Sequence, residues 1–200
     1  ALPDGLTVTG LAEAIKAGDA DVRDHLDRVL AGAEMPLAGL NSAFLDDGVV
    51  LRVKPGAMVE TPVHVVWLAA AGEAPLFHAP RLLVLAGAGS AATLLESQIA
   101  LDGGATLADS VSEIVVGDAA NLRHVILQNG TKASRAINAT GVAVGKGAAY
   151  HACTMTLHGG LTRNDLAVRL EGEGAEARLF GTYALGDGEH TDNTLAVEHL

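Results

Sequence analysis

The sequence predicts an all-β protein, a parallel β-helix that follows a short α-helical N-terminal segment. A Gly or Asp followed by Ala recurs after Val50, between short runs of β-forming residues. These dipeptides begin at residues 56, 87, 104, 118, 147 and 174, so their spacings are roughly multiples of 14 to 15 residues. Self-similarity at a fixed period of this size is typical of a solenoid, in which each repeat is one coil.

The composition favours the narrow interior of a β-solenoid over a globular core built around large rings. Apolar residues make up 49% of the 200 residues but aromatic residues only 3%, so the core must consist of Val, Leu, Ile and Ala. Such medium-sized side chains suit thin, closely packed layers. The 24 glycines suit the many tight turns of this fold.

The chain divides into a helical lead-in with a linker, residues 1–45, and a β-helix core, residues 46–200. Residues 11–17 predict a first helix that Gly18 ends. Asp19 is a good N-cap for a second helix over residues 20–31, because its side chain can accept a hydrogen bond from the first turn. An apolar stripe at helical spacing supports that helix: Val22, Leu26, Val29 and Leu30. Residues 37–45 are expected to form a connection, and the lead-in is expected to pack on one end of the solenoid.

Ten short runs predict strands, and no helical pattern lies between them. They cover residues 49–53, 63–68, 82–85, 92–95, 112–116, 122–127, 141–144, 155–157, 166–170 and 177–180. Alternation places Leu166, Val168 and Leu170 on one face, which we expect to be the core face. One coil of about 27 to 31 residues would hold two strands and two turns. A jelly roll or sandwich of Greek keys is the alternative, but turns that recur in phase favour the β-helix.

Charge and hydropathy exclude several classes of partner. The formal net charge of −11, without a basic stripe, opposes binding to nucleic acid. No apolar run approaches the roughly 18 residues of a membrane span, and no signal-peptide pattern opens the chain. Cys153 is the single cysteine, so no internal disulfide framework is possible and we expect a cytoplasmic protein.

The ends of the sequence suggest that the polypeptide is longer. It starts at Ala1 without Met, and it stops at Leu200 inside a strand-like run over residues 194–200. We expect a preceding segment and a β-helix core that is truncated at its C-terminal end. An exposed terminal coil invites pairing of strand edges, so a homodimer of the fragment is possible.

His151 and Cys153 are the first candidates for metal ligands. They are two residues apart on a predicted strand, so both side chains should point to the same face. A thiolate and an imidazole on one face can hold iron or zinc. The alternative is structural: a small apolar Cys and a polar His close to a turn. Two ligands do not make a site, and no metal site is predicted from this pair alone.

His190, Asp192 and His199 are the second candidate group. A carboxylate with imidazoles can ligate a metal or move a proton. Polar residues at the corner of a coil are more often structural, because Asn and Asp hydrogen-bond the backbone at turns and polar ladders are frequent in solenoids. We therefore favour a structural role for this group.

No sequence motif indicates an enzyme, and no catalytic or cofactor-binding residue is predicted. Gly145-Lys146-Gly147 lacks the frame of a phosphate-binding loop, and GxSxG is absent from the sequence. A carbohydrate-cleaving β-helix would need clustered aspartates and aromatic platforms for sugar rings. The acidic corner formed by Glu171, Glu173 and Glu176 is interpreted as a solvated turn that discourages edge pairing.

Several segments resemble SufD, a subunit of the SUF iron–sulfur cluster assembly machine. Their order and spacing match over about 160 residues, including the helical lead-in. The matching segments are LNSAF at 40–44, DGV at 47–49, VETPVH at 59–64, ATLLES at 92–97, GLTRNDL at 160–166, GEGA at 172–175, and HTDNT at 190–194 with His199.

This resemblance implies a right-handed parallel β-helix and a non-catalytic scaffold subunit. It also implies a complex with a homologous SufB-like subunit and a SufC-like ABC-type ATPase, which supplies the ATP hydrolysis. The iron–sulfur cluster would be present only transiently, at the interface of the two β-helix subunits in the full complex. No cofactor is expected to be intrinsic to this chain.

The departures from the family pattern limit what is carried over. The chain ends before the family's late segment that contains its functional histidine, and before the helical subdomain that docks the ATPase. No metal role is therefore transferred to His151, Cys153, His190 or His199, which stay candidates from their chemistry alone. The alternatives are a β-helix carbohydrate-active enzyme and a self-assembling structural β-helix.

Overall fold

The protein is a solenoid of thirteen strands with three short helices in the part of the chain that is described. The computed structural model describes residues 2–30, 35, 37–101 and 103–200. The helices are α1 (Leu11–Lys16), α2 (Ala20–His25) and α3 (Ala38–Ala43). The strands are β1 (Leu6–Gly10), β2 (Val49–Val53), β3 (Val63–Ala69), β4 (Leu76–His78), β5 (Arg81–Ala86), β6 (Ala91–Ala100), β7 (Thr106–Val116), β8 (Asn121–Asn129), β9 (Ser134–Val144), β10 (Ala149–His158), β11 (Leu161–Leu170), β12 (Glu176–Tyr183) and β13 (His190–His199).

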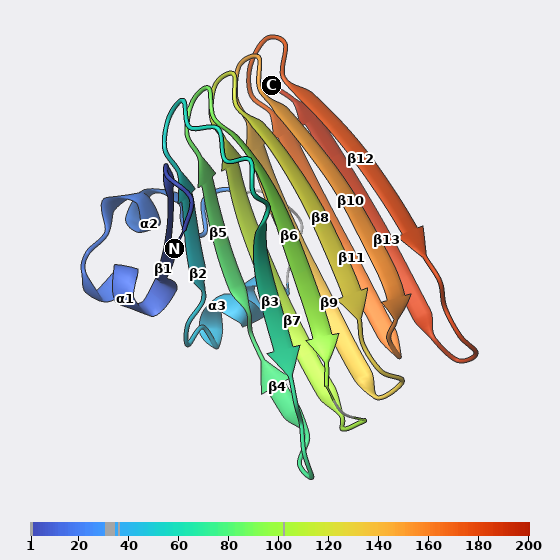
Figure 1. Cartoon of the computed structure of the whole chain (residues 1–200). Coiled ribbons are helices and arrows are strands. Elements are labelled where there is room, and N and C mark those ends of the chain that lie inside the picture. The colour runs from blue at the N-terminus through green and yellow to red at the C-terminus, as the bar shows by residue number, and fades with distance from the viewer. Residues whose placement is uncertain (1, 31–34, 36, 102) are drawn as a thin grey trace.

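The strands form two facing sheets that the chain visits in turn (Figure 1). Sheet A has the order β1-β2-β5-β7-β9-β11-β13, with β4 also paired to β7, and sheet B has the order β3-β6-β8-β10-β12. Every pairing is parallel except that of β1 with β2. The result is a parallel β-solenoid of about five turns, which confirms the predicted β-helix. A Greek-key sandwich is excluded, because its neighbouring strands are antiparallel.

Except for β2, the observed strands are longer than the runs that predicted them. The run over residues 112–116 is the end of β7, which begins at Thr106. Its first half, TLADS, contains Ala, Asp and Ser, which have weak β propensity, and in-register pairing with β9 keeps that half extended. Strands β1 and β4 were not predicted: β1 lies in the segment assigned to the helical lead-in, although Leu6 to Thr9 alternate, and the three residues of β4 are too few to recognise.

The recurring dipeptides form turns at one edge of the stack, where sheet A strands lead into sheet B strands. The exception is Gly104-Ala105, which lies at the opposite edge between β6 and β7. At Gly117 an added Cβ would lie 2.9 Å from the Ala86 carbonyl oxygen of the coil before, so only glycine allows this stacking. Gly145-Lys146-Gly147 is one of these turns, and the Lys146 N–H donates to Asp118 Oδ1 (2.9 Å). This contact gives the turn a structural role.

The space between the sheets holds the aliphatic core that the composition predicts. Val168 is 1% exposed and Leu170 is 8% exposed, and both pack in the main core cluster with the partly buried Leu166. The predicted core face of residues 166–170 is therefore confirmed. Tyr150 is fully buried and is the single aromatic side chain among the buried members of this cluster, against which the partly buried Trp67 packs.

The lead-in differs from its prediction at two points. Helix α1 and the Asp19 cap are confirmed, since Asp19 Oδ1 accepts from the Val22 N–H (3.2 Å). Helix α2, predicted to reach residue 31, ends at His25 because Asp27 takes a left-handed φ of 59°, which a helix cannot include. Residues 31–34, and with them the predicted helix end at Gly32, lie outside the described residues. The predicted connection over residues 37–45 contains α3.

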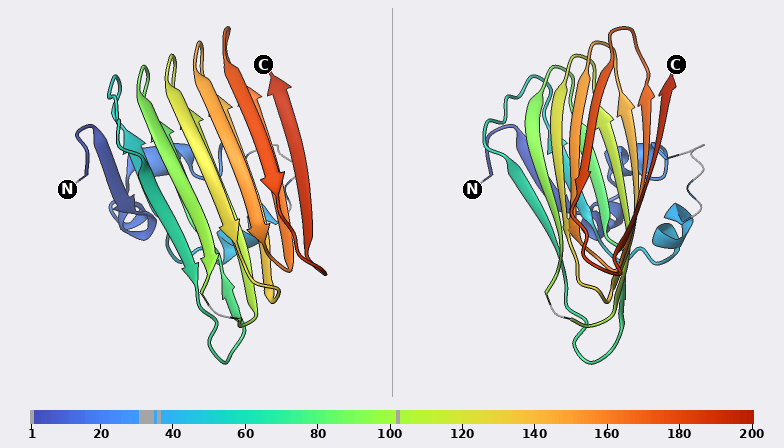
Figure 2. Two further views of the ribbon diagram at one scale, coloured as in Figure 1. Left: turned by 45° about the vertical axis from the view of Figure 1, so that its right-hand side comes forward. Right: turned by 90° about the vertical axis from the view of Figure 1, so that its right-hand side faces the viewer.

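The position of the lead-in also corrects the prediction. It packs on the outer face of sheet A and not on the end of the stack (Figure 2). Leu11, Ala14 and Val22 contact the outward side chains Val50 and Leu83. The end of sheet A is instead covered by β1, which pairs antiparallel with β2. The apolar outward residues of β2 and β5 explain the difference, because they offer the helices a surface to bury.

A buried ion pair fixes the lead-in to sheet A. Arg81 on β5 is fully buried, and its guanidinium lies 2.6 Å from both Glu113 Oε2 and Asp27 Oδ1. Its Nη1 donates to Asn41 Oδ1 on α3 (3.1 Å). The Glu113 carboxylate accepts further hydrogen bonds from the backbone N–H groups of Asp27, Val29 and Leu30. One pair of charges therefore holds both α3 and the segment after α2.

Asp109, also on the outer face of β7, is a buried carboxylate without a hydrogen-bond partner for its oxygens among the described residues. Burial raises the pKa of its carboxyl to about 6, although the nearby Arg81 charge opposes the shift. The folded chain therefore holds a proton on Asp109 between about pH 4 and 6, where the unfolded chain has lost it.

The first prediction concerns the core face of β11. Val168→Asp places a carboxylate between the sheets and should lower the free energy of unfolding by more than about 4 kcal/mol, as measured by urea denaturation. The matched control is Val66→Asp on β3, whose outward side chain is 42% exposed and should tolerate the change. A cooperative Val168→Asp transition at the wild-type urea concentration would show that the strand phase is wrong.

The second prediction concerns pH. Because the folded-state pKa of Asp109 is raised, its contribution to stability is largest at low pH and is lost as pH rises from about 4 to 6. Asp109→Asn removes this loss and should be more stable than the wild type at pH 7 by up to about 3 kcal/mol, with the advantage vanishing near pH 4. Urea denaturation at several pH values measures it, with the exposed Asp187→Asn as the control. A stability advantage that does not vary with pH would contradict the ionisation of Asp109 as its cause.

Candidate functional site

His151 and Cys153 share one face of β10, as predicted, and this face is the outward one. Their neighbours Tyr150 and Ala152 point into the core, and both candidates are half-buried. His151 Nε2 lies 3.5 Å from Glu176 Oε1, across the pairing of β10 with β12. Cys153 pairs in register with Val125 on one side and Phe180 on the other. His151 is thus flanked by two arginines, Arg123 and Arg178, and one carboxylate, whereas Cys153 is flanked by apolar side chains.

The second candidate group does not come together. His190 and Asp192 point outward from β13, whereas His199 has the opposite parity and points to the inner side. Asp192 Oδ2 lies 3.5 Å from Arg163 Nη1, and Asn193 accepts a hydrogen bond from Asn164 Nδ2 (2.9 Å) inside the stack. Across residues 2–30, 35, 37–101 and 103–200, no three His, Cys, Asp or Glu side chains gather closely enough to hold a metal ion.

A buried chain of polar groups crosses four strands of sheet B, β3, β6, β8 and β10. Trp67 Nε1 donates to Glu96 Oε1 (3.0 Å), and Glu96 Oε2 lies 3.1 Å from His124 Nε2. His124 Nδ1 lies 3.0 Å from the Tyr150 hydroxyl. Burial and the nearby Glu96 charge raise the pKa of Tyr150, so its hydroxyl stays protonated and can donate to His124 Nδ1. His124 Nε2–H is then the donor to Glu96.

A column of amides lies deeper between the sheets. Asn138, Asn164 and Asn193 occupy the same position on successive strands of sheet A. Gln128 of sheet B crosses the interior and donates to Asn164 Oδ1 (2.7 Å), while the Thr156 hydroxyl donates to Gln128 Oε1 (2.6 Å). Sequence reasoning missed these residues. Alignment of successive coils, 26 to 30 residues apart, would have placed them in one column.

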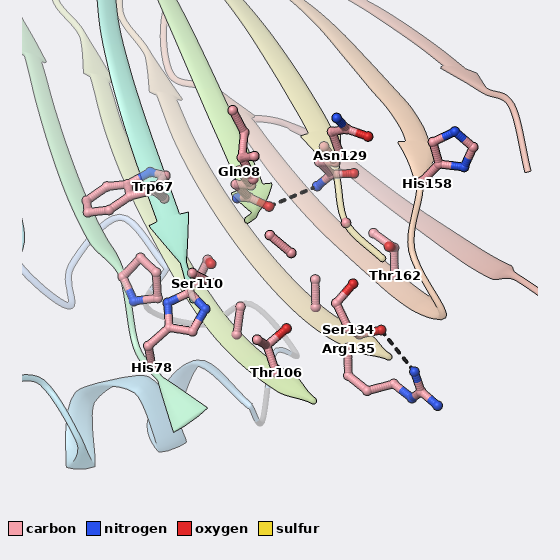
Figure 3. A pocket seen from close by; sticks show the side chains of 18 residues that line it. Trp67, His78, Gln98, Thr106, Ser110, Asn129, Ser134, Arg135, His158 and Thr162 are labelled. Carbon is pink, nitrogen blue, oxygen red and sulfur yellow. Dashed lines mark hydrogen bonds between the residues drawn. The ribbon is translucent and has the colours of Figure 1, made fainter. Parts of the chain in front are cut away.

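A cavity of about 50 Å³ adjoins this column at the edge opposite the glycine turns (Figure 3). Trp67, Gln98 and His78 form part of its wall, and burial lowers the pKa of His78. Ser110 Oγ reaches the same space and has no hydrogen-bond partner among the described groups. The cavity has room for a few water molecules or a small inorganic species, and it is far smaller than the roughly 300 Å³ of a typical organic-ligand site.

The last described coil, β12 and β13, has one unpaired edge in each sheet. Side chains that point inward on earlier coils are open here: Tyr183 is 65%, Leu195 56% and Val197 42% exposed. Free strand edges with apolar neighbours favour association with another strand. This coil can therefore accept a further coil by backbone pairing.

No helix within the described ranges is both long enough and apolar enough to cross a bilayer.

The chain is similar to proteins of iron–sulfur cluster assembly. Residues 68–200 match the family model for the SufBD core domain of SUF system FeS cluster assembly. A SufBD family protein of Synechocystis is 24% identical over 208 residues, which cover 99% of this chain and 46% of that protein. A SufBD family protein of Mycobacterium tuberculosis is 31% identical over 173 residues, covering 86% of this chain and 40% of that protein. SufD of Bacillus subtilis is 26% identical over 170 residues, covering 84% of this chain and 38% of that protein.

The chain thus spans less than half the length of each of these relatives. The region that matches the family model begins within β3 and contains every later strand of the solenoid. Because this region is well over half of the 200 residues, the chain belongs to the SufBD family of iron–sulfur cluster assembly proteins.

Proposed function

We propose that this chain is part of a SufD-like scaffold subunit in an iron–sulfur cluster assembly complex. The observation that carries the proposal is the family match over the same residues that form the parallel solenoid. The relative named SufD, from Bacillus subtilis, supports the SufD-like assignment. The proposed partners are a homologous SufB-like subunit and a SufC-like ABC-type ATPase.

In this proposal the chain has no catalytic activity of its own. ATP hydrolysis belongs to the ATPase, and the iron–sulfur cluster is cargo that forms transiently at an interface of the whole complex. The role of these coils is mechanical, because in-register strands with a close-packed core make a rigid platform. His151, Cys153, His190 and His199 are not proposed as ligands.

The exposed last coil supports the proposal that the chain acts by associating with a further coil. Leu195 and Val197 would be covered by a further coil with the same pattern, whether of the same polypeptide or of a homologous subunit. The 200-residue chain alone is expected to pair through this coil as a homodimer. The proposed setting is the cytoplasm, because a chain with one cysteine needs no oxidising compartment for an internal disulfide.

The third prediction tests this function by co-expression. The tagged full-length protein, produced with its native neighbours, should recover an ABC-type ATPase and a homologous β-helix subunit, together with ATPase activity and bound iron and sulfide. Mass spectrometry and metal analysis of the purified complex measure these components. Recovery of the protein alone, without ATPase or iron, would contradict the proposal.

Two variants of the same protein control that experiment. Val168→Asp, which disrupts the core between the sheets, should abolish partner recovery if the folded solenoid is what the partners bind. Asp187→Asn, an exposed change in the loop before β13, should leave recovery unchanged. Equal recovery with Val168→Asp would mean that the partners bind the tag or an unfolded segment.

A further inference from the structure

The outer face of sheet B carries aligned apolar side chains, one row of which is continuous. Because the strands pair in register, outward side chains at one position align across the coils. The apolar residues are here called the apolar face. The first row, Leu95, Val125, Cys153 and Phe180, is continuous over β6, β8, β10 and β12. In the second row, Ser97 separates Val66 from Leu127 and Met155, and in the third row, Leu68 and Ile99 are followed by Asn129.

This apolar face is open to solvent. Phe180 is 66%, Leu68 58% and Val66 42% exposed, and the other members are partly exposed. Monomeric proteins seldom leave contiguous apolar patches of this kind uncovered, and such patches mark interaction sites. A single exposed leucine would need no explanation, but nine outward apolar positions on five paired strands do.

The other outer face of the same solenoid shows what covers such a surface. On sheet A, Leu11 and Val22 of short amphipathic helices bury Val50 and Leu83. The three helices pack against strands of sheet A and lie on that side of the molecule (Figure 2). Within the described residues, nothing comparable lies on sheet B.

A basic row borders the apolar face. Arg123, His151 and Arg178 occupy the position adjacent to the first apolar row and align in register on β8, β10 and β12. Arg178 and His151 share the carboxylate of Glu176, whereas no described residue forms an ion pair with Arg123. In a chain of net charge −11, two aligned arginines beside an apolar patch favour a partner with carboxylates at that border.

The spacing of neighbouring strands matches the rise per turn of a helix that runs along the solenoid axis. One helical turn rises about 5.4 Å, close to the roughly 4.8 Å between neighbouring strands, so successive turns can meet successive coils. Five strands span about 19 Å, which is about thirteen helical residues. Carboxylates on one flank of such a helix would lie over Arg123 and Arg178.

We propose that the apolar face of sheet B is a docking surface for an amphipathic helix of a partner protein, with acidic side chains along the border that meets Arg123 and Arg178. A second copy of this chain fits less well. Among the outward residues of sheet B, Glu176 is the single carboxylate, so two copies face to face would offer no acidic row to the basic one. The proposal concerns a face apart from the last coil, and it does not depend on the identity of the SUF partners.

The fourth prediction uses two designed helical peptides as probes of the full chain. Both carry leucines at helical spacing, and one has glutamates along a border where the other has lysines. Fluorescence anisotropy should show that the acidic peptide binds at least about tenfold more tightly, and that added salt reduces the difference. The double variant Arg123→Glu with Arg178→Glu should reverse the preference.

The apolar contribution is tested separately with exposed residues that leave the fold intact. Phe180→Ser should weaken binding of both peptides about tenfold. The control is Phe44→Ser, because Phe44 is 59% exposed but lies after α3 and contacts Phe77 on the sheet A side. The proposal is overturned if neither peptide binds, if the two bind equally, or if the chain instead self-associates through a contact that Phe180→Ser abolishes.

Discussion

In-register stacking of parallel strands is the constraint on which the rest of this structure depends. Backbone hydrogen bonding to the next coil fixes each side chain above its counterpart, so one position in the repeat becomes a row across the molecule. Val142 and Val168 thereby join one aliphatic interior, and Asn138 and Asn164 form part of one amide column. The same rule aligns Arg123 with Arg178 on the outside. The alignment of side chains in the core, in the interior amide column and on the surface follows from a single register.

The two outer faces of the stack differ because one of them is already occupied. Arg81 and Glu113 are both fully buried, and together they fix the lead-in over sheet A. A buried ion pair adds little net stability, yet it is costly to break, so it gives the lead-in one position and not many. Sheet B has no such cover among the described residues and presents aligned apolar side chains beside a basic border. In the proposed role, the covered face serves the stability of the chain and the open face serves the docking of a partner.

Much of the fold follows from local sequence, whereas most of the site does not. Turn residues and aliphatic runs predict the solenoid, and β2 has the predicted bounds because its run of β-forming residues is followed directly by the turn sequence Lys54-Pro55-Gly56. Helix α3 was missed because AGLNSA has no apolar stripe, and Asn41 is held there by contacts with Arg81 and with backbone carbonyls of sheet A. Glu96, His124 and Tyr150 come from three coils, so their contact is visible only once the register is known. By contrast, alternation alone would have separated His199 from His190, since they have opposite parity on one strand.

The most direct test of this account is a distance between two coils. Spin labels at Arg123→Cys and Arg178→Cys, in a chain with Cys153→Ser, report on β8 and β12, which β10 separates. In-register stacking predicts backbone positions about 10 Å apart, which gives strong dipolar broadening of the continuous-wave spectrum. A spectrum equal to the sum of the two single-label spectra would place the labels beyond about 20 Å, four strand spacings, and would contradict the stacked rows from which both the core and the docking face are derived.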